Sequence, residues 1–281
     1  MAAHKVVLIT AGSAGLGAQI ARTFAPDFRV VINYANNADR AQAFLQELHN
    51  IPLAPSIPAA SAGTPRFHAI QADAGDKASV QSLVAETVKT MGRLDVVVSN
   101  VGWTRITNIL NLDEGVVEED WDKCFVYNVK THMWLAYAAK QHLDETEGTF
   151  ITTASVAGVK PSGSSLVSQS GRTCFRAGHV LNHGANIQVK PYAVTKAAQI
   201  HLAKSLAVIC APKIRVNSVS PGLLMTEWGQ KFPEAKIKKS IENTKLKRLA
   251  TVEDVANQVR TLALSQSQTG QNFLIEGGLT L

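Results

Sequence analysis

Cysteine, aromatic residues and long hydrophobic runs are all scarce in this chain of 281 residues. The three cysteines, Cys124, Cys174 and Cys210, are odd in number and far apart, so they form neither a disulfide framework nor the spacing of a metal site. No run reaches the ~18 apolar residues of a membrane span, and no cleavable leader precedes the apolar run from Val6 to Ile9. We therefore expect a cytoplasmic protein with no metal ion and no membrane segment.

Aromatic residues make up only 6% of the chain, although its formal net charge is +6. Such a charge is compatible with the binding of acidic partners. Nucleic acid is not indicated, however, because no basic stripe carries interleaved aromatic side chains. The apolar fraction of 46% is ample for a buried core. We therefore expect a globular protein that acts on a small molecule.

Short apolar segments alternate with helical patterns along the whole chain. The segments expected to form strands are Lys5–Thr10, Arg29–Tyr34, Arg66–Gln71, Leu94–Ser99, Gly148–Ala154, Ile214–Val219 and Asn272–Ile275. Continuous apolar strands separated by crossover helices are typical of a parallel sheet covered on both faces. The sequence therefore predicts an α/β fold: one Rossmann-like, doubly wound domain over residues 1–281 with a seven-stranded parallel sheet. We interpret the segments near residues 50–65 and 159–190 as insertions.

A glycine-rich turn, Thr10 to Gly17, joins the first strand to an amphipathic helix that we expect to end near Phe24. In that position a glycine-rich backbone can approach a pyrophosphate at the helix N-terminus. A tight strand-to-helix turn without a ligand is the alternative. Because the turn follows a strand and precedes a helix, we favour the interpretation that it binds a nucleotide.

The second strand ends in Asn33–Asn37 with no acidic residue, whereas sheets that bind NAD place one there to accept from the ribose hydroxyls. A carboxylate would repel a 2′-phosphate, so its absence favours NADP(H) over NAD(H). The candidate phosphate contacts are Ser13, Asn36 and the more distant Arg40.

Polar residues follow the later strands at the carboxyl edge, where parallel sheets bind ligands. Asp73 follows the third strand and either accepts from an adenine amino group or begins the turn before the helix cap Asp76. Ser155 ends the fifth strand. Asn128 falls inside a helix expected from Trp121 to Tyr137, where an asparagine without a function is usually solvated or bonded to its own backbone.

The segment from Pro191 to Ala198 predicts a helix that places Tyr192 and Lys196 one turn apart on one face. An ammonium group beside a phenol favours the phenolate, so we expect a lowered pKa for Tyr192. Taken alone, such a pair is more often an ordinary feature of a helix surface. The rest of the chain decides between the two interpretations.

Taken together, these motifs resemble those of the short-chain dehydrogenase/reductase family over nearly the whole chain. Thr10–Gly17 is similar to the family's T-G-x-x-x-G-x-G loop, and Ser99–Gly102 to its N-N-A-G element. Arg215–Gly222 resembles its R-V-N-x-x-x-P-G stretch, and Ile275–Gly278 its V-D-G-G. No single motif is decisive, but their common order is specific.

The resemblance implies hydride transfer between a nicotinamide and a carbonyl or alcohol, with Asn128, Ser155, Tyr192 and Lys196 as catalytic residues. Tyr192 then exchanges a proton with the substrate oxygen, and Ser155 polarises the carbonyl. Lys196 lowers the pKa of Tyr192 and bonds the nicotinamide ribose. Asn128 disturbs its helix and holds a water that passes protons to Lys196.

The resemblance and the strand ends together indicate the cofactor contacts, with Thr226 on the carboxamide. The expected contacts are Thr10, Gly12, Ser13, Gly15, Leu16, Gly17, Tyr34, Asn36, Asp73, Ala74, Asn100, Gly102, Tyr192, Lys196, Pro221, Gly222, Leu224 and Thr226. Trp103, Leu223 and Trp228 are expected to line the substrate site, and apolar residues there suit a hydrophobic or aromatic ketone. Packing of these residues between lid and body is the alternative.

Two departures from the family pattern have consequences. Ala11 replaces the first glycine of the loop, which affects the loop's backbone more than its role. Ser155 and Tyr192 are 37 residues apart, a longer gap than the family's, so Val159–Lys190 holds an insertion. We hypothesise that it caps the substrate pocket or alters a subunit interface. We expect a homo-oligomer, dimer or tetramer, that reduces ketones; a nucleotide-sensing regulator without turnover is the alternative.

Overall fold

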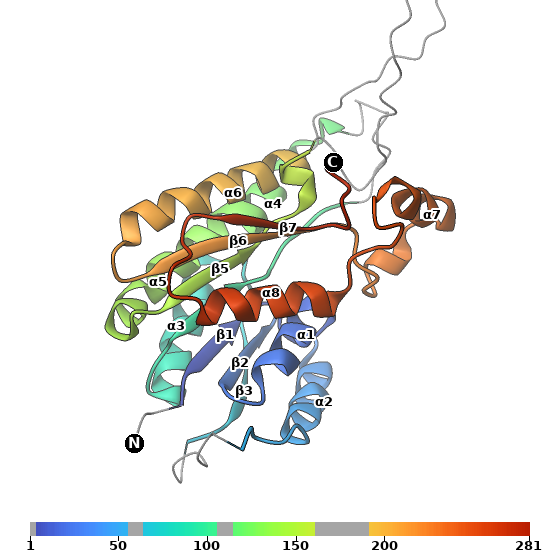
Figure 1. Cartoon of the computed structure of the whole chain (residues 1–281). Helices are drawn as coiled ribbons and strands as arrows, with labels where there is room; N and C mark the ends of the chain where they lie inside the picture. Colours follow the sequence, from blue (N-terminus) through green and yellow to red (C-terminus); the bar gives the residue numbers. More distant parts are fainter. Residues whose placement is uncertain (1–3, 56–63, 106–114, 161–190) are drawn as a thin grey trace, which may run out of the picture.

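The computed structural model describes residues 4–55, 64–105, 115–160 and 191–281 (Figure 1). In these residues seven strands form one parallel sheet in the order β3-β2-β1-β4-β5-β6-β7. The strands are β1 (Val6–Ile9), β2 (Arg29–Tyr34), β3 (Phe67–Gln71), β4 (Val96–Ser99), β5 (Thr149–Thr153), β6 (Arg215–Pro221) and β7 (Asn272–Ile275). Every predicted strand is present, with each end within two residues of its expected place.

Helices cover both faces of the sheet, as predicted (Figure 1). The α-helices of the described residues are α1 (Gly15–Phe24), α2 (Ala38–His49), α3 (Lys77–Met91), α4 (Glu118–Phe125), α5 (Thr131–Thr146), α6 (Pro191–Cys210), α7 (Glu234–Asn243) and α8 (Val252–Leu264). One core cluster packs α1, α2 and α8 against the sheet, and the other packs α3, α5 and α6. Successive residues of β1 point to opposite faces, so Val7 and Ile9 enter the first cluster while Val6 and Leu8 enter the second.

The helix expected from Trp121 to Tyr137 has a defect where Asn128 lies. A π-helical turn, Val126–Lys130, separates α4 from α5 without a break in the chain's helical path. Such turns insert one extra residue and occur often at functional sites. The prediction that Asn128 disturbs its helix is confirmed.

Most of the two predicted insertions lies outside the described residues, which omit 56–63 and 161–190. The hypothesis that Val159–Lys190 caps the pocket or alters an interface falls there as well. In the part of the chain that the structure describes, no helix is long and apolar enough to cross a membrane. The carboxyl ends of β1, β4, β5 and β6 meet at one edge of the sheet, and the site is built there.

Candidate active site

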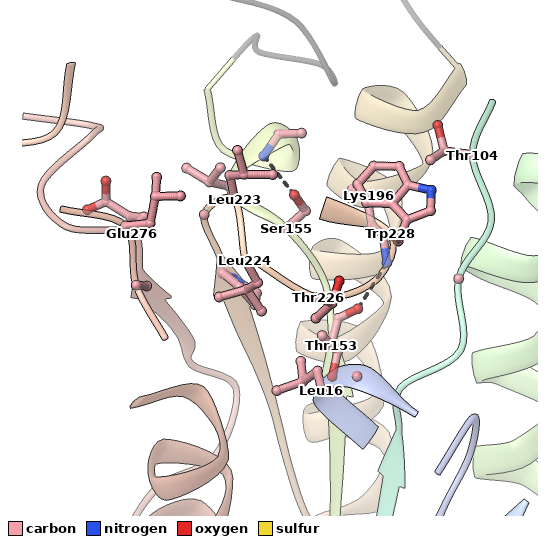
Figure 2. A pocket seen from close by; sticks show the side chains of 18 of the residues that line it. Leu16, Thr104, Thr153, Ser155, Lys196, Leu223, Leu224, Thr226, Trp228 and Glu276 are labelled. Carbon is pink, nitrogen blue, oxygen red and sulfur yellow. Dashed lines mark hydrogen bonds between the residues drawn. The ribbon is translucent and has the colours of Figure 1, made fainter. Parts of the chain in front are cut away.

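A cavity of ≈540 Å³ opens at the carboxyl edge of the sheet (Figure 2). It is enclosed by the loop before α1, the segments after β4 and β5, the start of α6, and the segment from the end of β6 into α7. The predicted residues that line it are Gly15, Leu16, Asn100, Gly102, Trp103, Ser155, Tyr192, Lys196, Pro221, Gly222, Leu223, Leu224, Thr226 and Trp228. Segments far apart in the sequence therefore meet at the carboxyl edge of the sheet, as predicted.

The N-terminus of α1 opens into this cavity without a side-chain cap. Its capping position is Ala14, which provides no side-chain hydrogen bond, and the first helical residues Gly15 and Leu16 line the cavity. By contrast α2, α3 and α8 are capped by Asn37, Asp76 and Thr251. The first N–H groups of a helix lack intrahelical partners and attract anions. The uncapped end fits the phosphates of a dinucleotide.

The remaining predicted positions of the loop support its backbone beneath the cavity. Thr10 is buried, and its Oγ1 accepts from the N–H groups of Asn100 at 2.8 Å and Val101 at 3.2 Å. A Cβ on Gly17 would lie 2.2 Å from the carbonyl oxygen of Ala11, so only glycine allows this close approach. Thr10, Gly12, Ser13 and Gly17 do not line the cavity.

Ala11 adopts the left-handed conformation, with φ +49°, that the family's glycine would adopt freely. The buried side chain of Asn33 supports this turn by accepting from the Ala11 N–H at 3.2 Å, while its amide donates to the Ala72 carbonyl at 2.9 Å. The loop therefore keeps its path despite the substitution. Asn33 was noted only as the end of a strand, and this function in the loop was not foreseen.

Four predicted cofactor contacts, Tyr34, Asn36, Asp73 and Ala74, do not line the cavity. Asp73 has an intramolecular function: its Oδ1 accepts from Tyr127 Oη at 3.0 Å and from Gly75 N–H at 2.8 Å. Its carbonyl also accepts from the N–H of the cap Asp76, at 3.1 Å. These contacts agree with the alternative that Asp73 begins a turn.

Ser155 follows β5 and caps a short 3-10 turn, Val156–Gly158. Its Oγ accepts from the Ala157 N–H at 3.2 Å, so the hydroxyl proton is free to be donated elsewhere (Figure 2). A Cβ on Gly158 would lie 2.5 Å from the carbonyl carbon of Lys196. This close approach presses the turn against α6 and brings Ser155 beside Tyr192.

The pKa values of the tyrosine and lysine differ from the expectation. Burial raises the pKa of Tyr192 above its ordinary value, and a hydrogen bond with Ser155 acts more weakly in the other direction. Burial lowers the pKa of Lys196 to about 7. The expected lowering of the tyrosine pKa by Lys196 is wrong for the protein by itself, because desolvation of the phenol outweighs any neighbouring charge.

Lys196 Nζ lies 5.7 Å from the ring centroid of Tyr192 and donates elsewhere. Its partners are the Thr153 carbonyl at 2.9 Å and Gln199 Oε1 at 2.8 Å. Figure 2 shows the bond to Thr153 beneath Trp228. Tyr192 and Lys196 thus share one end of the cavity, as predicted from their spacing, but the protein alone does not bring the ammonium onto the phenol.

Asn128 is fully buried and lies behind the cavity wall. Its Nδ2 donates to the Trp103 carbonyl at 2.9 Å and to Thr195 Oγ1 at 3.0 Å, and its Oδ1 accepts from the Trp103 N–H at 2.8 Å. One amide therefore ties the segment after β4 to α6. The water relay that the resemblance implies stays a prediction.

The opposite wall combines the predicted Trp228 with residues that the sequence did not indicate. Trp228 and Phe232 pack edge to face, with ring centroids 4.8 Å apart. The lining from α7 onward comprises Ser240, Asn243, Thr244, Leu249, Ala250, Glu276 and Leu279. Glu276 belongs to the Ile275–Gly278 motif, whereas the path of the chain brings the others here.

Comparison with known proteins agrees with this geometry. The family model described as short chain dehydrogenase matches residues 5–167, and one described as enoyl-(acyl carrier protein) reductase matches residues 174–280. The chain belongs to the short-chain dehydrogenase/reductase family. It is therefore an oxidoreductase that acts on alcohol and ketone groups with a nicotinamide nucleotide, which disfavours the alternative of a regulator without turnover.

Three relatives illustrate the likeness. A Streptomyces violaceoruber protein named ketoacyl reductase 2 of the granaticin polyketide synthase is 30% identical over 280 residues, 98% of this chain and 96% of its own. The 3-oxoacyl-(acyl-carrier-protein) reductase of Staphylococcus aureus is 29% identical, over 98% of each chain. A short chain dehydrogenase of Burkholderia cenocepacia, solved in complex with NADP, is 27% identical with a TM-score of 0.78, over 99% of each chain.

Proposed function

We propose that this enzyme reduces a hydrophobic or aromatic ketone with NADPH. The observation that carries the proposal is the cavity itself, which Ser155 and Tyr192 line together with Trp103, Leu223 and Trp228. Two hydroxyl groups beside a largely apolar lining suit a carbonyl on an apolar body. The relatives named for ketoacyl reduction support a ketone as the reacting group.

In this proposal Tyr192 is the general acid. Its raised pKa keeps the phenol protonated at neutral pH, which suits donation to a carbonyl oxygen and hence reduction over oxidation. Ser155, whose hydroxyl proton is not needed for its own cap, donates to the same oxygen as negative charge develops there. Bound NADPH supplies the hydride.

Lys196 and Asn128 act around this pair. Lys196 is the cation of the site and would hold the nicotinamide ribose, and its proximity stabilises the negative charge that develops on the substrate oxygen. Asn128 fixes the segment after β4 that carries Gly102 and Trp103. Without Asn128 the wall that faces Lys196 would be free to shift.

The preference for NADPH is argued from charge. No carboxylate stands at the end of β2, where one would repel the 2′-phosphate. Arg40, in the first turn of α2, supplies a cation on that side and pairs with Glu227 at 3.3 Å. The NADP complex of the Burkholderia relative supports the same choice.

We also propose a cytoplasmic homo-oligomer, either a dimer or a tetramer. Exposed apolar side chains on α5 and α6 support it: Tyr137 is 74% exposed, Val208 80% and Ile209 68%. Light scattering on the purified protein would measure the mass, and a monomer at micromolar concentration would contradict this part of the proposal.

The deciding experiment follows the absorbance of NADPH and NADH against a panel of ketones, aldehydes and quinones. Tyr192→Phe is expected to lower kcat by about 10²- to 10⁴-fold, the usual contribution of a general acid. Binding of NADPH, followed by its fluorescence, should persist in that variant. Substantial residual turnover in Tyr192→Phe would contradict the assignment.

A further inference from the structure

The ammonium of Lys196 is anchored by an amide. Lys196 is 3% exposed, and its Nζ donates to Gln199 Oε1 at 2.8 Å and to the Thr153 carbonyl at 2.9 Å. Gln199 lies three residues further along α6, on the same face, and is fully buried. A buried glutamine in the middle of a helix needs partners for all of its polar atoms.

The orientation of that amide is fixed by its neighbours. An ammonium group only donates and a backbone carbonyl only accepts. Gln199 must therefore present its oxygen to Lys196 and its nitrogen to the Thr153 carbonyl, at 3.1 Å. The same nitrogen donates to Thr152 Oγ1. A flipped amide would place like groups against each other on both sides.

The network continues into the core. Thr152 Oγ1 accepts from Gln199 and also lies 3.2 Å from His132 Nδ1. Ser99 Oγ lies 2.6 Å from the same nitrogen. Burial and the nearby Lys196 lower the pKa of His132 well below its ordinary value, which keeps the imidazole neutral. The hydrogen bonds of this neutral imidazole hold Thr152, and through it Gln199, in place.

From these contacts we propose that Gln199 is a positioning residue that holds the ammonium of Lys196 at the reacting end of the cavity. The proposal rests on the role given to Lys196 under the proposed function. Gln199 does not line the cavity, so it acts through Lys196 alone. A helix that needed only packing at this position would place an apolar residue there, as α6 does at Ala203 and Ala207.

Hydrogen bonds to the charged form stabilise it, and the pKa of Lys196 is therefore the quantity that Gln199 should control. The other groups that face Lys196 are Cys124 of α4, His132 of α5 and Tyr192 of α6. Burial raises the pKa of the Cys124 thiol to about 11, so it is neutral, as is His132. The hydrogen bonds to Gln199 and Thr153 are the contacts of the ammonium that stabilise its charged form against burial.

Two variants of matched size test the proposal. Gln199→Met keeps the length but removes the acceptor, so the pKa of Lys196 should fall by about one unit. Gln199→Glu places a carboxylate at the same point and should raise that pKa by a similar amount. If the pKa of Lys196 falls in one variant and rises in the other, a general loss of stability is excluded as the cause.

The measurement is an NMR titration of the Lys196 Nζ resonance in protein carrying ¹⁵N-lysine, assigned with Lys196→Met. It requires no turnover, so it remains informative if the proposed function fails. Gln141→Met, an exposed glutamine of α5, is the control and should leave the resonance unchanged. Where ketone reduction is found, the alkaline limb of kcat should move in the same direction as the pKa, because activity needs the protonated lysine. A Lys196 pKa that is unchanged in Gln199→Met, or that falls in both variants, overturns the proposal.

Discussion

The cavity has two walls of different character. The inner wall follows the ends of β4 and β5 and the start of α6; the outer wall is formed by residues 222–243 (Figure 2). Lys196 of the inner wall is 3% exposed, and the fully buried side chains of Asn128 and Gln199 lie behind that wall. Gln199 bonds Lys196 itself, and Asn128 bonds the neighbouring Thr195. Trp228 on the outer wall is 38% exposed, and Glu227 lies at the surface.

The two walls of the cavity contribute differently to the reaction. Hydrogen bonds between buried groups are strong, and an unpaired buried group is costly, so the inner wall has one arrangement. Exposed contacts are screened by water and contribute little each. Proton transfer therefore belongs to the inner wall, and the choice of cofactor and substrate to the outer wall. Changes to the inner wall should have the larger effects.

Apart from the loss of the Tyr192 hydroxyl, the largest effect is expected where the inner wall packs tightly against α6, at Gly158. In Gly158→Ala the new Cβ would lie 2.5 to 2.7 Å from backbone atoms of Lys196 and Ala197, which cannot yield. The turn must then move away from α6 and take Ser155 from Tyr192. A displacement of about 1 Å can cost 10²-fold, so we expect kcat to fall by that factor.

Gly92 is the matched control for that substitution. It ends α3 with φ +74° and has nothing within 4 Å of an added Cβ. Gly92→Ala should lower the unfolding free energy by about 1 kcal/mol because of its left-handed conformation, and leave kcat unchanged. Both variants are compared by steady-state kinetics and thermal unfolding. Full activity in a folded Gly158→Ala protein would contradict the comparison of the two walls.

On the outer wall the expected effects are smaller and concern cofactor choice. Glu227 pairs with Arg40, and both side chains are exposed. In the proposed function Arg40 contacts the 2′-phosphate, so Glu227 competes with that phosphate for Arg40. Glu227→Gln should therefore tighten NADPH binding by about 3- to 5-fold. Arg40→Gln should weaken it by about 10-fold, the scale of an ion pair near a surface.

The controls are NADH and salt. NADH lacks the 2′-phosphate, so neither variant should change its Kd, measured by fluorescence titration. The advantage of Glu227→Gln should shrink as salt is raised, since screening weakens exposed pairs most. Equal changes in NADPH and NADH affinity would show that the pair affects the fold of the outer wall and not the phosphate.

The same division separates what the sequence predicts from what it does not. The strands, the uncapped loop before α1 and the grouping of Ser155, Tyr192 and Lys196 follow from local patterns that any parallel sheet brings to one edge. Gln199 was readable in principle, as the polar residue three positions after Lys196. Its role depends on Thr152 and His132, which only the fold brings near.

Two kinds of information were beyond the sequence. The lining from Ser240 to Ala250 depends on how the chain returns over the cavity after β6, and no motif marks it. The pKa of Tyr192 depends on burial, which a helical spacing does not report, so the expected direction was wrong. Asn33 likewise has a role in the loop that only its neighbours reveal.

The smallest expected effect lies at Ala11, on the rim between the two walls. Ala11→Gly relieves the left-handed strain at φ +49°, but the glycine gains freedom in the unfolded chain, so the net stabilisation should be about 0.5 to 1 kcal/mol. Glu147→Gly, at a left-handed cap on α5 with φ +48°, is the matched control and should stabilise similarly. Thermal unfolding measures both, and NADPH affinity should stay constant in each. Because the bond from the Ala11 N–H to Asn33 persists in glycine, a loss of stability confined to Ala11→Gly would show that the contacts of the Ala11 methyl group outweigh the strain.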